Sequence, residues 1–208
     1  MSGSDEELGC VALSDLDSLD LRGWFTDEEG AWYAAAVEAV EGQVVEVGTW
    51  RGRSTSYLAP VLAGRPLRLT CVDRWSGSSD AWNAAYVTRL AAAEADGLSV
   101  QASFERNMAS LDIPVRVLAM PSLRAVEYFA DGSCDLVFLD ASHDESAVSA
   151  DLCAWWPKVA QGGLLAGHDY DLVRHPGLVD AVQAFVCALG LEFSRGPGRI
   201  FVVRTPDF

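Results

Sequence analysis

Short apolar runs alternate with longer segments of mixed character along most of this chain. The runs have the length of buried β-strands, and they lie at Gln43–Val47, Leu67–Val72, Val115–Ala119, Asp135–Leu139 and Leu164–Gly167. The segments between them predict helices at Ser54–Ala63, Leu123–Ala130, Glu145–Trp156 and Leu178–Leu189. Short apolar strands separated by helices predict a parallel sheet covered by helices on both faces.

Local signals define the helix before the first strand. Thr26-Asp27-Glu28-Glu29 is a capping box with acids in the first turn, so we expect a helix from here to about Val40. Gly42 then ends it. Farther along, Pro60 predicts a kink in the helix at Ser54–Ala63.

The rest of the chain gives two further expectations. The long segment 74–113 has room for two or three helices. Near the C-terminus, Glu192–Ser194 and Arg199–Val203 flank a Gly-Pro-Gly turn. This pattern predicts a hairpin that adds an antiparallel strand to the sheet.

The composition suits a single domain. The chain has 208 residues, half of them hydrophobic, and no internal repeat. We expect residues 1–25 to form an acidic lead-in and residues 26–208 to form the domain. The net charge of −15 argues against nucleic acid as a partner, because its phosphates are bound mainly by Lys and Arg, and equally against anionic membrane surfaces.

Targeting signals and cysteines bear on the compartment. No segment approaches the roughly 18 apolar residues of a membrane span, and the N-terminus lacks a basic region followed by an apolar one. The five cysteines are widely spaced without a C-x-x-C pair, and Cys71 and Cys134 fall within predicted buried strands. Reduced, core-filling thiols in a cytoplasmic protein are therefore expected.

A glycine turn follows the first predicted strand. Val44–Val47 runs into Gly48 and Gly52, and Ser54-Thr55 can begin the next helix. A strand, a glycine turn and a helix N-terminus let the backbone approach a ligand closely. The G-x-x-x-G spacing matches neither the dinucleotide fingerprint nor the P-loop, but an acid, Asp73, ends the next strand. The two features together indicate a nucleotide-type ligand; the alternative is a generic Rossmann-like turn beside a surface aspartate.

The turn and Asp73 resemble the S-adenosylmethionine (SAM) pocket of class I methyltransferases. The resemblance covers roughly residues 40–205 and implies a Rossmann-like α/β fold: a mostly parallel seven-stranded sheet with an antiparallel last strand and helices on both faces. In that family the turn passes under the methionine and ribose, the acid binds both ribose hydroxyls, and a residue after the third strand meets the adenine. The cofactor-binding residues implied here are Glu46, Gly48, Thr49, Gly52, Ser54, Thr55, Asp73, Arg74, Trp75, Ser122, Asp140 and Ala141.

Acids and histidines follow the fourth and fifth predicted strands. Asp140 and His143 come after the fourth, and His168 and Asp169 after the fifth. We expect Asp140, His168 and Asp169 to converge at the ligand edge of the sheet. Two carboxylates and an imidazole facing one point favour a bound cation, Mg²⁺ for the oxygens and Mn²⁺ if a neutral imidazole joins them. The alternative is structural: Asp140 caps a helix, His168 bonds to backbone, and Asp169 closes a turn.

A longer pattern resembles the metal-dependent O-methyltransferases that modify macrolide and aminocoumarin sugars. It comprises Phe138-Leu139-Asp140-x-x-His143, then Asp151-Leu152-x-x-Trp155-x-Pro157, and Gly162-Gly163-x-Leu165-x-Gly167-His168-Asp169-Tyr170. In that family an Asp after strand four and an adjacent acidic pair after strand five bind Mg²⁺. The resemblance implies Asp140, His168 and Asp169 as the metal set; because His168 replaces a carboxylate, it is either a ligand or a group that supports one.

The same resemblance implies catalytic roles for His143 and Asp140. A histidine three residues after the first metal ligand is the general base in the macrolide-sugar branch, and His143 occupies that position. The ordinary pKa of histidine suits proton removal near neutral pH. The alternative for His143 is a polar residue at a helix N-terminus with its ring in solvent.

The segment after Asp73 has two interpretations. Arg74–Asp80, with Trp82, Asn83 and Tyr86, is rich in glycine, serine and aromatic residues, as expected of a lid over a sugar or adenine. Trp75 and Trp82 equally suit core packing.

These features together predict a SAM- and Mg²⁺-dependent O-methyltransferase. The expected acceptor is a sugar hydroxyl of a glycoside or oligosaccharide, such as a short mannose or glucose oligomer of polysaccharide biosynthesis. Two alternatives stay open: a metal-dependent methyltransferase of a catechol or phenolic natural product, and a non-catalytic SAM-binding module. Dimers are common in the family it resembles, so a homodimer is a further expectation.

Overall fold

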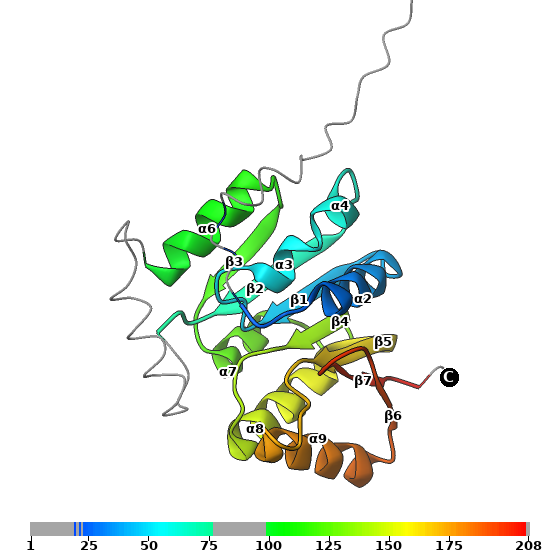
Figure 1. Cartoon of the computed structure of the whole chain (residues 1–208). Helices are drawn as coiled ribbons and strands as arrows, with labels where there is room; N and C mark the ends of the chain where they lie inside the picture. Colours follow the sequence, from blue (N-terminus) through cyan, green and yellow to red (C-terminus); the bar gives the residue numbers. More distant parts are fainter. Residues whose placement is uncertain (1–18, 20, 22, 77–98, 207–208) are drawn as a thin grey trace, which may run out of the picture.

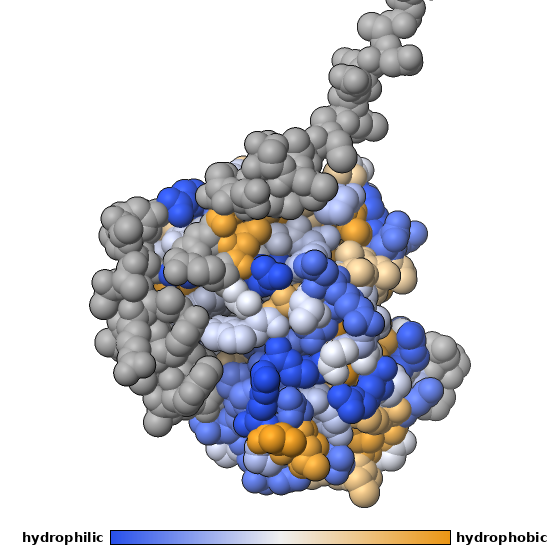
Figure 2. Space-filling model, in the orientation of Figure 1, coloured by the Kyte–Doolittle hydropathy of each residue, from blue (hydrophilic) through white to orange (hydrophobic). Residues whose placement is uncertain are grey.

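The computed structural model describes residues 19, 21, 23–76 and 99–206. The expected lid residues Trp82, Asn83 and Tyr86 and most of the acidic lead-in lie outside this part of the chain. No helix among the described residues is long and apolar enough to cross a membrane. On the face shown in Figure 2, the hydrophobic residues of the described part form small separate patches between larger hydrophilic areas.

The strands form one seven-stranded sheet in the order β3-β2-β1-β4-β5-β7-β6 (Figure 1). β7 pairs antiparallel with both β5 and β6, whereas β1 to β5 pair in parallel. This confirms the predicted Rossmann-like α/β sheet with an antiparallel strand near its end. The strands are β1 Gln43–Val47, β2 Arg68–Asp73, β3 Val115–Ala119, β4 Cys134–Leu139, β5 Val159–Gly167, β6 Glu192–Arg195 and β7 Phe201–Arg204.

Helices cover both faces of the sheet, as predicted (Figure 1). Alternating residues of β1 point to opposite faces: Val45 and Val47 pack with α7, α8 and α9, while Val44 packs with α2, α4 and α6. The buried thiols of Cys71 and Cys134 fill these two layers. The helices are α2 Asp27–Glu38, α3 Arg53–Ser56, α4 Ala59–Leu62, α6 Val100–Ser110, α7 Ser122–Ala125, α8 Glu145–Trp155 and α9 Pro176–Leu189, with 3₁₀ turns at Val126–Tyr128 and Trp156–Lys158.

Three elements differ from their predicted form. The helix expected at Ser54–Ala63 is two short helices, because the chain turns at Tyr57-Leu58 and Pro60 stands in the first turn of α4, where its missing N–H costs nothing. The helix expected at Leu123–Ala130 begins at Ser122 and tightens into a 3₁₀ turn. β5 begins earlier than predicted, at Val159, because this residue pairs with β4 across a register shift.

The sheet places a crevice beside β1 and β4. β1 and β4 are neighbours, and the order of the strands reverses between them. The sheet continues through β2 and β3 on one side and through β5, β7 and β6 on the other. Ligands bind beyond the carboxyl ends of parallel strands where the order reverses in this way. Backbone hydrogen bonds tie the loops there together: Asp140 N–H to the Val47 carbonyl (2.7 Å) and His168 N–H to the Leu139 carbonyl (3.0 Å).

Candidate active site

The glycine turn after β1 is held in a backbone conformation that side chains disfavour. Gly48 and Gly52 have φ of +89° and +85°, and Trp50 between them has +50°. A Cβ at Gly48 would collide with the backbone carbonyl of Asp140. The turn is therefore pressed against the start of the loop that follows β4.

Glu46 supports this turn from below. Its carboxylate is fully buried and accepts hydrogen bonds from Ser54 Oγ (2.5 Å), Thr55 Oγ1 (3.0 Å) and Tyr33 OH (3.3 Å). Burial raises the pKa of Glu46 to about 7, since it outweighs the hydrogen bonds from Ser54 and Thr55 that favour the charged form. The carboxylate fixes the start of α3 and does not line the cavity above it.

Asp73, at the end of β2, holds the turn from the other side by hydrogen bonds to its backbone. Its carboxylate accepts the backbone N–H groups of Trp50 (2.9 Å) and Trp75 (2.7 Å). Burial raises the pKa of Asp73, although these backbone hydrogen bonds oppose that effect. The Trp75 indole donates to the Trp50 carbonyl (2.8 Å) and lies against Phe104, with ring centroids 5.4 Å apart. Trp75 thus packs inward and also borders the cavity.

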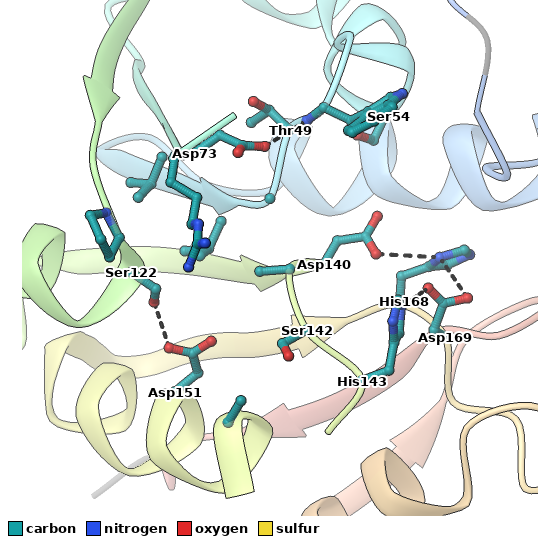
Figure 3. Close-up of a pocket in the computed structure, with 18 of the residues that line it drawn as sticks. Thr49, Ser54, Asp73, Ser122, Asp140, Ser142, His143, Asp151, His168 and Asp169 are labelled. Atoms are coloured by element: carbon teal, nitrogen blue, oxygen red, sulfur yellow. Dashed lines mark hydrogen bonds and ion pairs between the residues drawn. The ribbon is translucent and has the colours of Figure 1, made fainter. Parts of the chain in front are cut away.

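These groups open into a cavity of about 330 Å³ that runs along the strand ends (Figure 3). One unsatisfied group points to a ligand: Thr49 is 2% exposed, and its hydroxyl has no hydrogen-bond partner among the described residues. Most of the expected cofactor residues line this cavity, whereas Glu46, Gly52 and Thr55 do not. The residues that line it are Gly48, Thr49, Ser54, Asp73, Arg74, Trp75, Ser122, Asp140 and Ala141.

One end of the cavity carries a hydrogen-bonded polar group from α7 and α8. Ser122 Oγ donates to Asp151 Oδ1 (2.6 Å) and accepts the Trp155 indole N–H (2.8 Å). Burial raises the pKa of Asp151, and the hydrogen bond from Ser122 opposes this shift. Both Ser122 and Asp151 line the cavity.

The other end carries the acids and histidines. His168 Nδ1 faces Asp140 Oδ1 at 3.6 Å and Asp169 Oδ1 at 3.5 Å (Figure 3). Its Nε2 lies 3.0 Å from Glu29 Oε1. Burial alone would lower the pKa of His168, but Asp140, Asp169 and Glu29 raise it to about 11. The convergence expected of Asp140, His168 and Asp169 is thus present in the fold.

Asp169 joins this cluster to further cationic side chains. It has φ of +61°, and its Oδ2 lies 2.9 Å from His143 Nε2. Its Oδ1 accepts Arg199 Nη1 (2.5 Å) and lies 3.8 Å from His175 Nε2. Burial raises the pKa of Asp169, but the hydrogen bond with His143 and the nearby charge of His168 outweigh it and hold that pKa far below its usual range.

His143 and His175 stack, with ring centroids 4.2 Å apart and planes inclined by 22°. Burial and the neighbouring His143 lower the pKa of His175. The His143 side chain is 20% exposed and borders the cavity. The ring thus contacts Asp169 and His175 as well as solvent.

Sequence comparison with protein families matches residues 45–170 to the family described as Methyltransferase domain (Methyltransf_24). The match covers more than half of the chain, including the glycine turn and the acids that follow β2, β4 and β5. The chain belongs to this family. It is a SAM-dependent methyltransferase, and the expected class of enzyme is confirmed. Comparison with curated proteins gives no match.

Solved structures show the same fold for this methyltransferase. The O-methyltransferase NovP is 18% identical, with a TM-score of 0.66 over 92% of this chain and 88% of NovP. CalS11, a TDP-rhamnose 3′-O-methyltransferase of calicheamicin biosynthesis, is 15% identical, with a TM-score of 0.55 over 95% and 88%. An O-methyltransferase from Bacillus cereus, solved with S-adenosylhomocysteine (SAH), is 17% identical, with a TM-score of 0.56 over 92% and 87%.

The donor set of the methyltransferase fits a divalent cation. One ligand atom from each of Asp140, His168 and Asp169 lies within 4.8 Å of the others. If a cation replaces the Nδ1 proton, the His168 ring keeps its Nε2–H on Glu29 and turns its Nδ1 lone pair toward the two carboxylates. The Arg199 guanidinium already lies on Asp169, so a cation there must share or displace this contact.

Several groups of this site did not emerge from the sequence. In the sequence, Glu29 is recognisable only as part of a capping box, and Asp151 only as part of a family motif. His175 had the weak signal of being the third histidine in a chain with three. For Arg199, which follows a Gly-Pro-Gly turn, no local pattern indicates that the hairpin brings it to Asp169.

Proposed function

We propose that this methyltransferase transfers a methyl group to a sugar hydroxyl of a glycoside or oligosaccharide, with a divalent cation at Asp140, His168 and Asp169. One observation carries the proposal: the glycine turn and Asp73 share a single cavity with Asp140, His143, His168 and Asp169. The sugar acceptor rests on a weaker argument, which is the similarity of fold to CalS11 and NovP together with the sequence motifs. A catechol or phenol acceptor is the second candidate.

The cavity offers complementary groups for SAM along its length. Asp73 lines the cavity at the end of β2, where its carboxylate oxygens can accept ribose hydroxyls. The buried Thr49 hydroxyl supplies an unused polar contact beside the glycine turn. Ser122 and Asp151 lie at the end that suits the adenine. SAM supplies an electrophilic methyl group on a sulfonium.

Asp140 and Asp169, with His168, would hold the cation and through it the acceptor. A divalent cation supplies positive charge that lowers the pKa of a bound hydroxyl. The chain's own contribution is to fix three donors on two strand ends, where backbone hydrogen bonds hold both loops. Fixed donors orient the acceptor oxygen toward the methyl donor without later rearrangement.

His143 takes the proton that the acceptor loses. In the tautomer whose Nε2–H donates to Asp169, Nδ1 is the atom that accepts this proton. The resulting imidazolium stays paired with the Asp169 carboxylate at 2.9 Å, which stabilises its charge. The balance is one methyl gained by the acceptor oxygen, one proton gained by His143, and SAM converted to SAH.

The first experiment is calorimetric titration of SAH into the purified protein, with Asp73→Ala as the matched variant. We expect micromolar binding that Asp73→Ala abolishes. Sugar nucleotides, glycosides and catechols are then screened with SAM, and products are detected by mass spectrometry as the gain of one methylene. A methylated sugar whose formation EDTA suppresses supports the proposal. If only catechols are methylated, the acceptor is a catechol and the sugar proposal is wrong.

Two active-site variants distinguish an enzyme from a SAM-binding module. His143→Ala and Asp140→Asn should retain SAH binding and lose about 100-fold or more in turnover, because each removes a group that acts on the acceptor. Unchanged turnover in His143→Ala would rule out its role as the base.

A further inference from the structure

Glu29 and His168 form a buried pair behind the proposed cation site. Glu29 lies on α2, and it is 1% exposed, while His168, at the end of β5, is 2% exposed. The Phe25 ring covers the imidazole, with ring centroids 4.9 Å apart. Proteins commonly orient a metal-ligating imidazole by a carboxylate that accepts the N–H of the ring nitrogen that does not bind the metal.

We propose that Glu29 orients His168 as a ligand through Nδ1, and that the site therefore selects Mn²⁺ over Mg²⁺. The inference rests on the proposed function, because it assumes a cation at Asp140 and Asp169. Imidazole nitrogen suits transition-metal cations, whereas Mg²⁺ prefers oxygen donors and keeps its waters. One nitrogen ligand among carboxylates is thus enough to change which cation binds more tightly.

The hydrogen bonds of Glu29 define which nitrogen of His168 carries the proton. Glu29 Oε2 accepts the Thr26 N–H (2.8 Å) and hydroxyl (2.9 Å), and Oε1 accepts the Arg199 N–H (2.9 Å). Both oxygens of this carboxylate thus already act as acceptors, so the contact with Oε1 at 3.0 Å makes His168 Nε2 the donor.

Nδ1 then faces the two aspartates, where a cation would take the place of its proton. Its distances of 3.6 Å to Asp140 Oδ1 and 3.5 Å to Asp169 Oδ1 are long for hydrogen bonds. Ligands that share one cation, at bond lengths of about 2.1 Å, lie roughly 3.0–3.5 Å apart. The distances from Nδ1 to both aspartates are thus close to those within a common ligand set.

Calorimetry on the full, metal-stripped chain measures the preference directly. We expect Mn²⁺ to bind at least about tenfold more tightly than Mg²⁺. Pulsed electron paramagnetic resonance of bound Mn²⁺ should show coupling to a directly bound nitrogen. His168→Asp should still bind Mn²⁺ without that coupling, and its preference for Mn²⁺ over Mg²⁺ should fall or reverse.

Glu29→Gln tests the orienting role. The amide can donate as well as accept, so it no longer fixes the protonated nitrogen, and Mn²⁺ affinity should fall about 10- to 100-fold. Glu28→Gln is the matched control, because Glu28 is exposed on the same helical turn, and its affinity should not change. SAH titration of each variant verifies the fold; if Glu29→Gln fails to bind SAH, the His168→Asp comparison decides.

The outcomes separate the two proposals. If SAH binds but no divalent cation does, the cation part of the proposed function fails, and this inference fails with it. If a cation binds but Mg²⁺ equals or exceeds Mn²⁺, or no nitrogen coupling appears, only this inference is overturned. Unchanged Mn²⁺ affinity in Glu29→Gln would overturn the role of Glu29.

Discussion

Glu46 shows how one buried carboxylate couples the site to pH. Its pKa of about 7 exceeds the ordinary value of 4.5 because burial disfavours the charged form. Between these two pH values the folded state therefore binds more protons than the unfolded state. The free energy of unfolding should decrease as pH rises through this window and then level off, with a contribution from Glu46 of about 3 kcal/mol.

Glu46→Gln should remove that component. Urea titration from pH 4.5 to 8 gives the free energy of unfolding of wild type and of Glu46→Gln. As pH rises, wild type should lose stability relative to the variant. A difference that does not depend on pH would contradict the raised pKa.

Variants of two threonines near the turn can distinguish a ligand contact from a structural hydrogen bond. The Thr49 hydroxyl has no partner among the described residues, whereas the Thr55 hydroxyl donates to Glu46 at 3.0 Å. Thr49→Val should weaken SAH binding about tenfold with little loss of stability. Thr55→Val should cost about 1–3 kcal/mol of stability, because it removes a buried hydrogen bond. Calorimetry and urea titration of both variants test this, and SAH binding unaffected by Thr49→Val would remove the proposed ligand contact.

At the scale of elements, the turn between β1 and α3 depends on both its own conformation and its packing against α6. Gly52 has φ of +85°, and a Cβ there would meet the Met108 methyl and the Phe104 ring. The sequence predicted β1 and the glycines, since short apolar runs and G-x-x-x-G are local signals. It could not predict that α6, far along the chain, closes on this turn.

Gly52→Ala should destabilise the protein by about 1–2 kcal/mol through backbone strain alone, and weaken SAH binding because the turn moves. Gly64→Ala is the matched control: Gly64 also has positive φ, of +68°, but nothing lies within 4 Å of its Cβ position. It should show similar strain and unchanged SAH affinity. Equal SAH affinity in both variants would mean that the turn does not shape the cofactor site.

For the whole molecule, the site joins segments that are distant in sequence. Strand and helix order, and the convergence of Asp140, His168 and Asp169, could be predicted because carboxyl ends of neighbouring parallel strands meet at one edge. Glu29 and Arg199, which lie 170 positions apart, could not, since their hydrogen bond depends on how α2 and the β6–β7 hairpin pack around β5. Local patterns identify residues at strand ends, whereas partners from other layers depend on tertiary packing.

The position of Arg199 against Asp169 is the clearest consequence of this packing. Its guanidinium donates to Asp169 (2.5 Å) and to the Trp24 carbonyl (2.8 Å), so it neutralises an acid that is 12% exposed. Without a cation, Arg199→Gln removes the positive charge that pairs with the mostly buried Asp169 carboxylate. The substitution should therefore destabilise the protein by about 1–3 kcal/mol. The melting temperature should fall accordingly, by about 5 °C.

The same variant should respond more strongly to metal. With the guanidinium removed, a cation at Asp140, His168 and Asp169 has no competitor for Asp169 Oδ1, so it binds more tightly and stabilises the folded state more. Thermal unfolding with increasing Mn²⁺ should therefore raise the melting temperature of Arg199→Gln more than that of wild type. Arg204→Gln, an exposed position on β7 of the same hairpin, should respond as wild type does. Equal Mn²⁺ responses in wild type and Arg199→Gln would mean that Arg199 and the cation do not compete for Asp169.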